Sequence, residues 1–226
     1  MNAIRMTTAC LGAVLLGGCM QARIEESREI ATHITKDESV VILAKPQIEG
    51  AGAEDVFMDC ISENLRGGKG GLQVHDNNEF VDQMFPWFEP STAPGKPEAM
   101  SELLARPGVS DQVAKSGVRY VVWLDGNTRK TDGGGSLACG AAPGGAGCIG
   151  FGWWQMESAY EATIWDLKQA KSAGSVGTNV TGTSAIVGAI VPLPFIARVQ
   201  ATACNRMSTQ LRSFFSGTDG IPAGTH

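Results

Sequence analysis

The sequence lacks a long hydrophobic run, a cluster of basic residues and a grouped set of metal ligands. Its N-terminal apolar stretch, residues 6–18, is shorter than the roughly 20 residues that a membrane-spanning helix needs. With 18 Lys and Arg against 23 Asp and Glu, and no basic patch, nucleic acid is excluded as a partner. The three histidines are scattered and no Cys-x-x-Cys pair occurs, so we predict neither a metal site nor a cofactor.

The sequence also lacks the motifs of common catalytic sites. The pattern G-x-S-x-G fails because Ala138 follows the residues GGSL, and neither S-x-x-K nor H-E-x-x-H occurs. Residues 66–71 (RGGKGG) lack the GK[ST] of a phosphate loop and follow a predicted helix rather than a strand. His75, Asp76 and Glu79 are more typical of a strand end and a helix N-cap than of an acid–base group. We therefore predict that the protein is not an enzyme.

The N-terminus has the charge order and length of a signal peptide. Arg5 supplies a positive charge, and the small apolar residues 6–18 follow it. This run ends in LGG before Cys19, which resembles the lipobox of bacterial lipoproteins. In a lipobox, small residues precede a cysteine whose thiol takes a diacylglyceryl group. The resemblance implies that residues 1–18 are removed and that Cys19 carries acyl chains such as palmitate.

Lipidation implies a compartment as well as an anchor. Loss of residues 1–18 removes Arg5 and leaves 17 basic (18 minus 1) and 23 acidic residues. Met20 stands where aspartate favours inner-membrane retention of enterobacterial lipoproteins. By that resemblance we expect a lipid-anchored protein of the outer membrane that faces the periplasm. Its polar residues 19–38 are interpreted as the lipidated N-terminus and a spacer.

Four cysteines remain for disulfides, which an exported protein can form: Cys60, Cys139, Cys148 and Cys204. Cys139 and Cys148 flank a Gly/Ala/Pro segment that has no side chains to build a core. We predict a disulfide that closes this loop and limits the unfolded chain by about 2–3 kcal/mol. Cys60 and Cys204 each lie in a predicted helix and are left either to pair or to remain buried thiols.

Hydrophobic periodicity predicts an alternation of strands and helices in residues 39–216. The expected strands are 40–44, 72–75, 118–124, 153–167 and 175–184. The expected helices are 54–66, 79–85, 98–105, 110–116 and 198–215. In the first helix, one face is expected to carry Val56, Phe57, Cys60, Ile61 and Leu65. A glycine-rich loop is expected after Thr128 up to about Gly150, and residues 217–226 are interpreted as a disordered tail.

This order predicts an α/β (α+β) fold in a single domain: one mixed sheet of about five strands with helices packed across it. Three segments resemble the α/β domain of several outer-membrane lipoproteins: residues 40–65, residues 115–122 and the strand that ends at residue 167. These proteins include the lipoprotein activators of penicillin-binding proteins, the curli secretion channel lipoprotein and the amino-terminal domain of TolB. The resemblance concerns the fold, and a fold does not determine function.

Two apolar segments are candidates for binding. Phe85, Trp87 and Phe88 lie between prolines, and such aromatic side chains anchor interfaces or stack on sugar rings, unless they cover one end of the sheet. Residues 185–197, together with Phe151, Trp153 and Trp154, are suited to a membrane surface, a subunit contact or burial under the terminal helix.

The sequence therefore favours a non-enzymatic, outer-membrane-anchored lipoprotein that acts as an adaptor or activator in the cell envelope. Its expected partners are membrane lipid, through the acylated Cys19, and an envelope protein or peptidoglycan. The first alternative is an oligomeric secretion or pore-forming subunit. A cell-wall hydrolase is a weaker alternative because no catalytic group of residues is visible.

Overall fold

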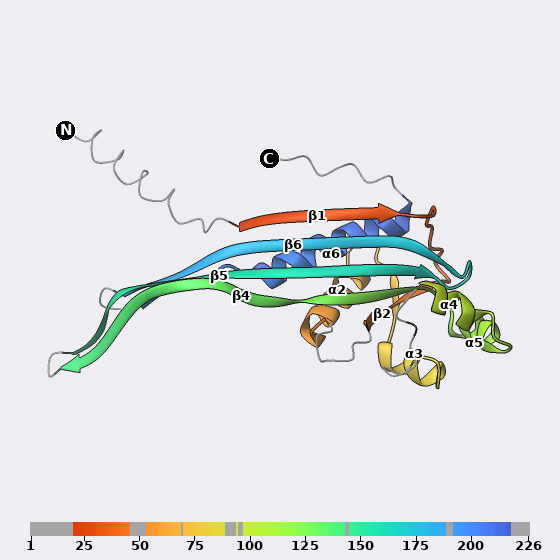
Figure 1. Ribbon diagram of the computed structural model, residues 1–226, viewed down its shortest axis with the longest axis horizontal. Coiled ribbons are helices and arrows are strands. Elements are labelled where there is room, and N and C mark those ends of the chain that lie inside the picture. Colours follow the sequence, from red (N-terminus) through yellow and green to blue (C-terminus); the bar gives the residue numbers. More distant parts are fainter. Residues whose placement is uncertain are drawn as a thin grey trace. The chain divides into compact units, whose positions relative to one another are not determined.

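The computed structural model describes residues 20–45, 53–68, 70–88, 94, 97–142, 145–188 and 192–217. These residues form one mixed sheet of seven strands, together with five helices (Figure 1). The order across the sheet is β1 (Met20–Arg28), β6 (Lys171–Gly188), β5 (Gly145–Asp166), β4 (Val118–Ala142), β2 (Ser39–Ala44) and β3 (Gln73–His75), and β7 (Pro192–Phe195) pairs with β6. The predicted fold class is confirmed, and the sheet has more strands than the five expected.

The chain divides into two compact units. Unit 1 comprises residues 1–21, 129–157 and 181–199, and unit 2 comprises residues 22–128, 158–180 and 200–226. Strands β1, β4, β5 and β6 contribute residues to both units, which are described separately below.

Unit 2 is built around the short strand β2. Its residues Val40 and Val41 are fully buried, as expected for a β-branched run inside a sheet. β2 pairs in parallel with β3, where Val40 is opposite Val74, and in parallel with β4, where Val41 is opposite Val121. β2, β3 and β4 therefore form the parallel part of the mixed sheet.

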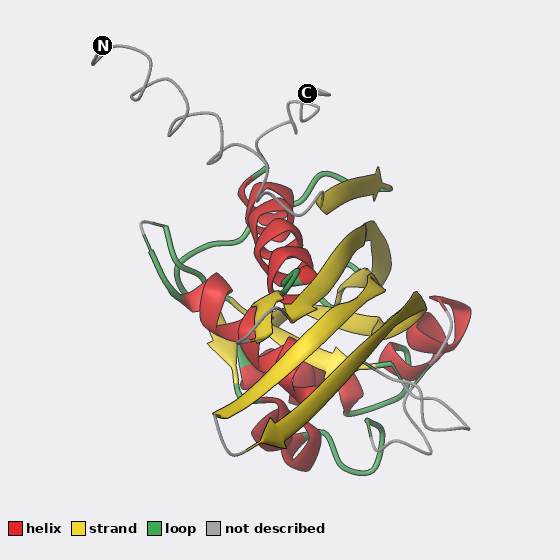
Figure 2. Cartoon of the chain, turned by 90° about the vertical axis from the view of Figure 1, so that its left-hand side faces the viewer, coloured by secondary structure: helices red, strands yellow, loops and turns green. Residues whose placement is uncertain are grey.

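Helices cover unit 2's part of the sheet on two faces (Figure 2). On one face, α2 (Asp55–Arg66) is joined to α6 (Val199–Ser216) by a disulfide between Cys60 and Cys204. On the other face, α3 (Asn77–Gln83), α4 (Pro97–Leu104) and α5 (Val109–Ser116) lie over a core that includes Val121, Trp123 and Trp165.

The buried side of α2 differs in part from the prediction. Phe57, Ile61 and Leu65 are buried as expected, but Met58 is buried too and Val56 is 70% exposed. The reason is geometric, because Met58 lies three residues before Ile61 and extends the same helical stripe, whereas Val56 falls outside it. The N-cap of α3 is as predicted: Asp76 accepts a hydrogen bond from the backbone N–H of Glu79 at 3.0 Å.

Besides β7, two segments without an expected strand form strands. Residues 20–28 were interpreted as part of a spacer, yet they form β1 at the edge of the sheet, where charged side chains are common. The glycine-rich segment 129–150 was expected to be a loop, yet it continues β4 and begins β5. Gly135 shows why glycine suits this strand: its φ is +112°, and a Cβ there would lie 2.2 Å from the carbonyl oxygen of Phe151.

Candidate functional site

The sheet of unit 2 leaves part of one face without helices. An open hollow of about 960 Å³ lies there, and every described residue that lines it belongs to β1, β4, β5 or β6. Side chains alternate between the two faces of a strand, so this face is presented by every second residue of β1 and β6. Several lining residues are small, among them Gly126, Ala159 and Gly177, so few side-chain atoms fill the hollow. The hollow is therefore a shallow, polar recess on the sheet surface.

Carboxylates outnumber cations in the lining of this recess. The lining contains four acidic residues and one basic residue, in chain order Arg23, Glu25, Glu26, Asp125 and Glu161. Arg23 is paired with Glu25 at 2.8 Å, and both side chains are mostly exposed. Asp125 lies 3.7 Å from Lys45. Glu161 forms no hydrogen bond or ion pair with any residue in the described part of the chain. The recess therefore has a local excess of negative charge.

Tyr160 ties the floor of the recess to the helices on the other face. Its ring is stacked on Phe57 of α2, with centroids 3.5 Å apart, and its hydroxyl donates a hydrogen bond to Glu54. Gln200 of α6 donates to the same hydroxyl at 3.2 Å. Burial, followed by the hydrogen bond to Glu54, raises the pKa of Tyr160 to about 12. Tyr160 is therefore a neutral anchor below the sheet and is not available as an acid or base at ordinary pH.

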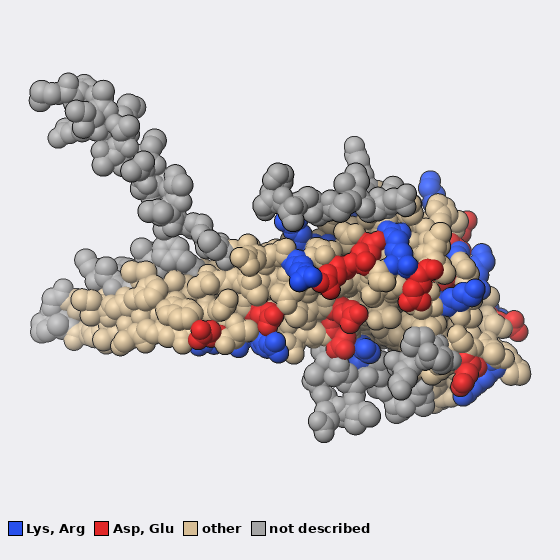
Figure 3. Space-filling model, turned by 45° about the horizontal axis from the view of Figure 1, so that its top comes forward, with Lys and Arg blue, Asp and Glu red and all other residues tan. Residues whose placement is uncertain are grey.

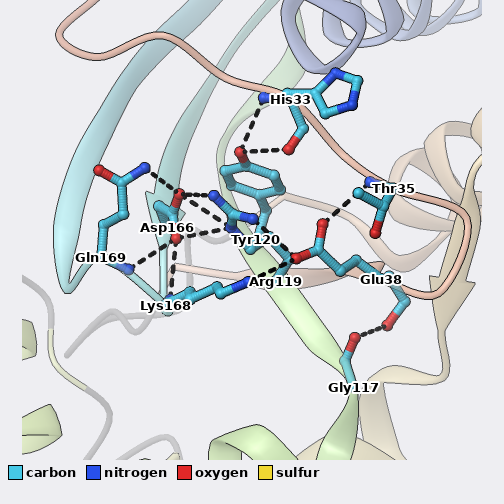
Figure 4. Close-up of polar contacts among 10 residues, drawn as sticks. His33, Thr35, Glu38, Gly117, Arg119, Tyr120, Asp166, Lys168 and Gln169 are labelled. Carbon is cyan, nitrogen blue, oxygen red and sulfur yellow. Dashed lines mark hydrogen bonds and ion pairs between the residues drawn. The ribbon is translucent and has the colours of Figure 1, made fainter.

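A second polar cluster surrounds Arg119 (Figure 4). Its guanidinium donates to both carboxylate oxygens of Asp166, at 2.8–3.1 Å, and to Glu38 at 2.8 Å. Asp166 is completely buried and also accepts from the backbone N–H groups of Lys168 and Gln169 at 3.0 Å. The cluster joins the start of β4 to the end of β5 and to the segment before β2.

The charges of this cluster stabilise one another. Burial tends to raise the pKa of Glu38, but hydrogen bonds from Thr35 and Arg119 outweigh it and lower the pKa to about 2. The hydrogen bonds to Asp166 are the largest influence on Arg119 and raise its pKa. Because the carboxylate oxygens of Glu38 and Asp166 all accept hydrogen bonds within the protein, we assign this cluster a structural role.

The structure contains both disulfides named from the sequence. Cys139 and Cys148 are bonded within unit 1 as predicted and close the segment between them, but both cysteines lie in strands, β4 and β5. Cys60 and Cys204, for which the sequence left a pair or two thiols open, are bonded in unit 2. The predicted lipidation site, Cys19, and the signal peptide lie outside the described residues, as does the tail after residue 217.

The three aromatic residues proposed as an interface do not form one exposed group. Phe85 is 65% exposed, but Phe88 is only 3% exposed and its ring packs edge-on against Phe80. Trp87 is partly buried against the core of α3–α5. The prediction is therefore wrong for Phe88, because this ring completes the core under α3 rather than facing solvent.

The described residues contain no group of three or more His, Cys, Asp or Glu side chains that could hold a metal ion.

Sequence reasoning missed the recess, because it forms only when β1 lies beside β6. A signal for the Arg119 cluster was present, namely a single charged residue inside the apolar strand VRYVVWL. None of the helices in the described ranges is long and apolar enough to cross a membrane.

Comparison with known proteins found no matching family model and no matching curated protein. Among solved structures, the chain is similar to the PelC dodecamer from Paraburkholderia phytofirmans, with 11% identity and a TM-score of 0.44 over 88% of this chain and 100% of that chain. A variant of the same dodecamer, in another crystal form, gives 10% identity and a TM-score of 0.42 over 89% and 99%. These similarities are too distant to assign a family or a function.

Proposed function

We propose that the protein is a lipid-anchored, non-enzymatic adaptor of the bacterial cell envelope, located at the outer membrane and facing the periplasm. It binds a partner protein through the recess on the uncovered face of unit 2. The observation that carries the proposal is this recess, which is lined by sheet residues alone and has an excess of carboxylates.

The anchor follows from the lipobox-like sequence that ends in Cys19. Acyl chains on the N-terminal cysteine provide more than the single chain that gives only marginal membrane binding. Confinement near one membrane raises the effective concentration of the protein for partners in the same envelope. The two disulfides are consistent with an oxidising compartment such as the periplasm.

The charge of the recess points to a partner with a basic surface. Glu161 has no partner among the described residues, so its carboxylate is available for an approaching Lys or Arg. Glu25 is paired with Arg23, but this pair is mostly exposed and can exchange for a cation of the partner. Complementary surface charges mainly raise the rate of association and select between partners. The low floor at Gly177 and Ala159 gives an extended basic segment access to the sheet surface.

The anchor is tested by Cys19→Ala, which should abolish metabolic labelling with an alkyne-bearing fatty acid and release the protein from membranes. Continued labelling of this variant would refute the lipidation site.

The recess is tested in the intact lipoprotein by charge reversal. Glu161→Lys should reduce the yield of envelope proteins crosslinked to the protein in cells. Glu63→Lys is the matched control, because Glu63 is an exposed glutamate on α2 that does not line the recess. Equal yields from the two variants would exclude the recess as the binding surface.

The alternative of an oligomeric secretion subunit is distinguished by the mass of the detergent-solubilised lipoprotein. A monomer fits the adaptor, and a stable ring of many subunits would contradict it.

A further inference from the structure

Long stretches of unit 1 carry no charge, and the charged residues of its segments 129–157 and 181–199 lie near the segment ends: Arg129, Lys130, Asp132, Glu157 and Arg198. Residues 133–156 and 172–197 contain no Asp, Glu, Lys or Arg. Besides residues 1–21, unit 1 consists of residues 129–157 and 181–199. Most of these residues fall within the two stretches. In Figure 3 a long surface without red or blue atoms contrasts with the charged surface elsewhere. Soluble proteins keep charge on strand surfaces that face water, so this composition indicates another environment.

Unit 1 also exposes apolar side chains. Among the described residues, seven large hydrophobic side chains are exposed, and five of them belong to unit 1: Met20, Ile149, Phe151, Val187 and Ile196. Ile149 is 73% exposed, Ile196 is 66% exposed and Phe151 is 48% exposed. Exposed apolar groups scattered singly are ordinary, but unit 1 concentrates five of the seven in a part of the chain that has few charged residues. Ile149 and Phe151 lie two residues apart on β5 and therefore on the same face of that strand, which favours contact with an apolar phase.

Two tryptophans belong to the same unit. Trp153 and Trp154 are each partly exposed on β5, and the ring of Trp153 lies over Gly134, whose added Cβ would be 3.4 Å from the indole nitrogen. Indole rings prefer the boundary between lipid headgroups and acyl chains, because they combine an apolar body with one hydrogen-bond donor. The aromatic content of unit 1 therefore fits a bilayer surface.

The position of Met20, next to the proposed lipid anchor, also points to a membrane. Met20 belongs to unit 1, and its Cγ would lie 2.9 Å from a Cβ built on Gly182. The first described residue therefore packs against β6 within this unit. The residue before it is Cys19, and successive Cα atoms are about 3.8 Å apart. Acyl chains on Cys19 would therefore enter the bilayer beside unit 1. This step rests on the lipidation proposed above.

We propose that unit 1 is a membrane-contacting surface, which lies in the headgroup region of the bilayer that holds the lipid anchor. In the sheet β5 lies between β4 and β6, so the strand that carries both tryptophans has a neighbour on each side to pair with its backbone groups. The lack of charged side chains in residues 133–156 and 181–197 removes the largest energetic barrier to such contact for these stretches. The anchor and unit 1 together give the protein two attachments to the same membrane.

The test uses the mature lipoprotein reconstituted into vesicles of phosphatidylethanolamine and phosphatidylglycerol with brominated acyl chains. Bromine quenches indoles that reach the acyl boundary, as expected for a surface buried about 5–10 Å into the interface. We expect quenching that is mostly lost in the double variant Trp153→Phe/Trp154→Phe and retained in Trp87→Phe. The substitutions Ile149→Asp and Phe151→Asp should also reduce it, whereas Val56→Asp, on the exposed side of α2, should not.

Each outcome bears on the proposal separately from the anchor. Acylated protein without quenching would overturn the membrane contact and leave the lipid anchor intact. If the protein isolated from cells carries no acyl chain and is still quenched, the membrane contact is supported and the missing acyl chain refutes the anchor. Quenching unaffected by Ile149→Asp and Phe151→Asp, or a crosslinked dimer that depends on Ile149, would overturn the proposal; the dimer would assign the surface to a second copy of the chain.

Discussion

The buried ion pair of Arg119 and Asp166 allows a quantitative prediction. Replacing Arg119 by methionine keeps most of the side-chain volume but removes all the guanidinium donors to Asp166. The carboxylate, which is 0% exposed, then keeps only the donors of Lys168 and Gln169. Breaking a buried pair by removing one partner typically costs about 3–5 kcal/mol. We expect Arg119→Met to lower the free energy of unfolding by that amount.

Urea unfolding followed by tryptophan fluorescence measures this loss, with two further variants as controls. Asp166→Asn combined with Arg119→Met removes the unpaired charge and keeps an acceptor for the backbone N–H groups, so the double variant should be more stable than Arg119→Met alone. Arg129→Met removes the exposed pair with Glu157, in which Arg129 is 65% exposed, and should cost less than about 1 kcal/mol. If Arg119→Met costs no more than Arg129→Met, the assignment of the cluster as a stabilising element is wrong.

Three further predictions concern pH and the interhelical disulfide. Because the folded-state pKa of Glu38 is lowered from 4.5 to about 2, its contribution to stability is present above pH 4.5 and is lost as pH falls toward 2. Glu38→Gln should remove that part of the acid dependence of unfolding. Because the folded-state pKa of Tyr160 is raised from 10 to about 12, stability should fall as pH rises across that range, and Tyr160→Phe should flatten the alkaline limb of the stability curve. Replacing Cys60 and Cys204 by serine opens a loop with a sequence separation of 144 and should cost about 5 kcal/mol in calorimetry or urea unfolding, and a loss below about 1 kcal/mol would contradict the loop-entropy argument.

The parts of the fold that the sequence predicted are those with strong hydrophobic periodicity. The buried strand β2, the amphipathic α2 and the terminal α6 each have a pattern that only one type of element satisfies. Their boundaries differ from the prediction by a residue or so. The N-cap at Asp76 was readable for a related reason, because a capping side chain acts within its own turn.

The missed parts depend on partners distant in sequence. β1 has a charged sequence that is typical of a spacer, and it becomes a strand because β6 offers an edge to pair with. The glycine-rich part of β4 contains turn-forming residues, yet Gly135 is required there by the close approach of the strand that carries Phe151. The recess follows from the first of these pairings, so no local pattern could indicate it.

The disulfide between α2 and α6 has a topological consequence. It closes a covalent ring that contains β3, β4, β5, β6 and β7, and thus the whole of the chain between Cys60 and Cys204. A protease that cuts once anywhere in this ring, including the extended strands of unit 1, leaves a nicked molecule in a single covalent piece. The N-terminal segment and the terminal helix therefore stay together after a cleavage that would divide an unbridged chain, and the fragments separate on a gel only after reduction.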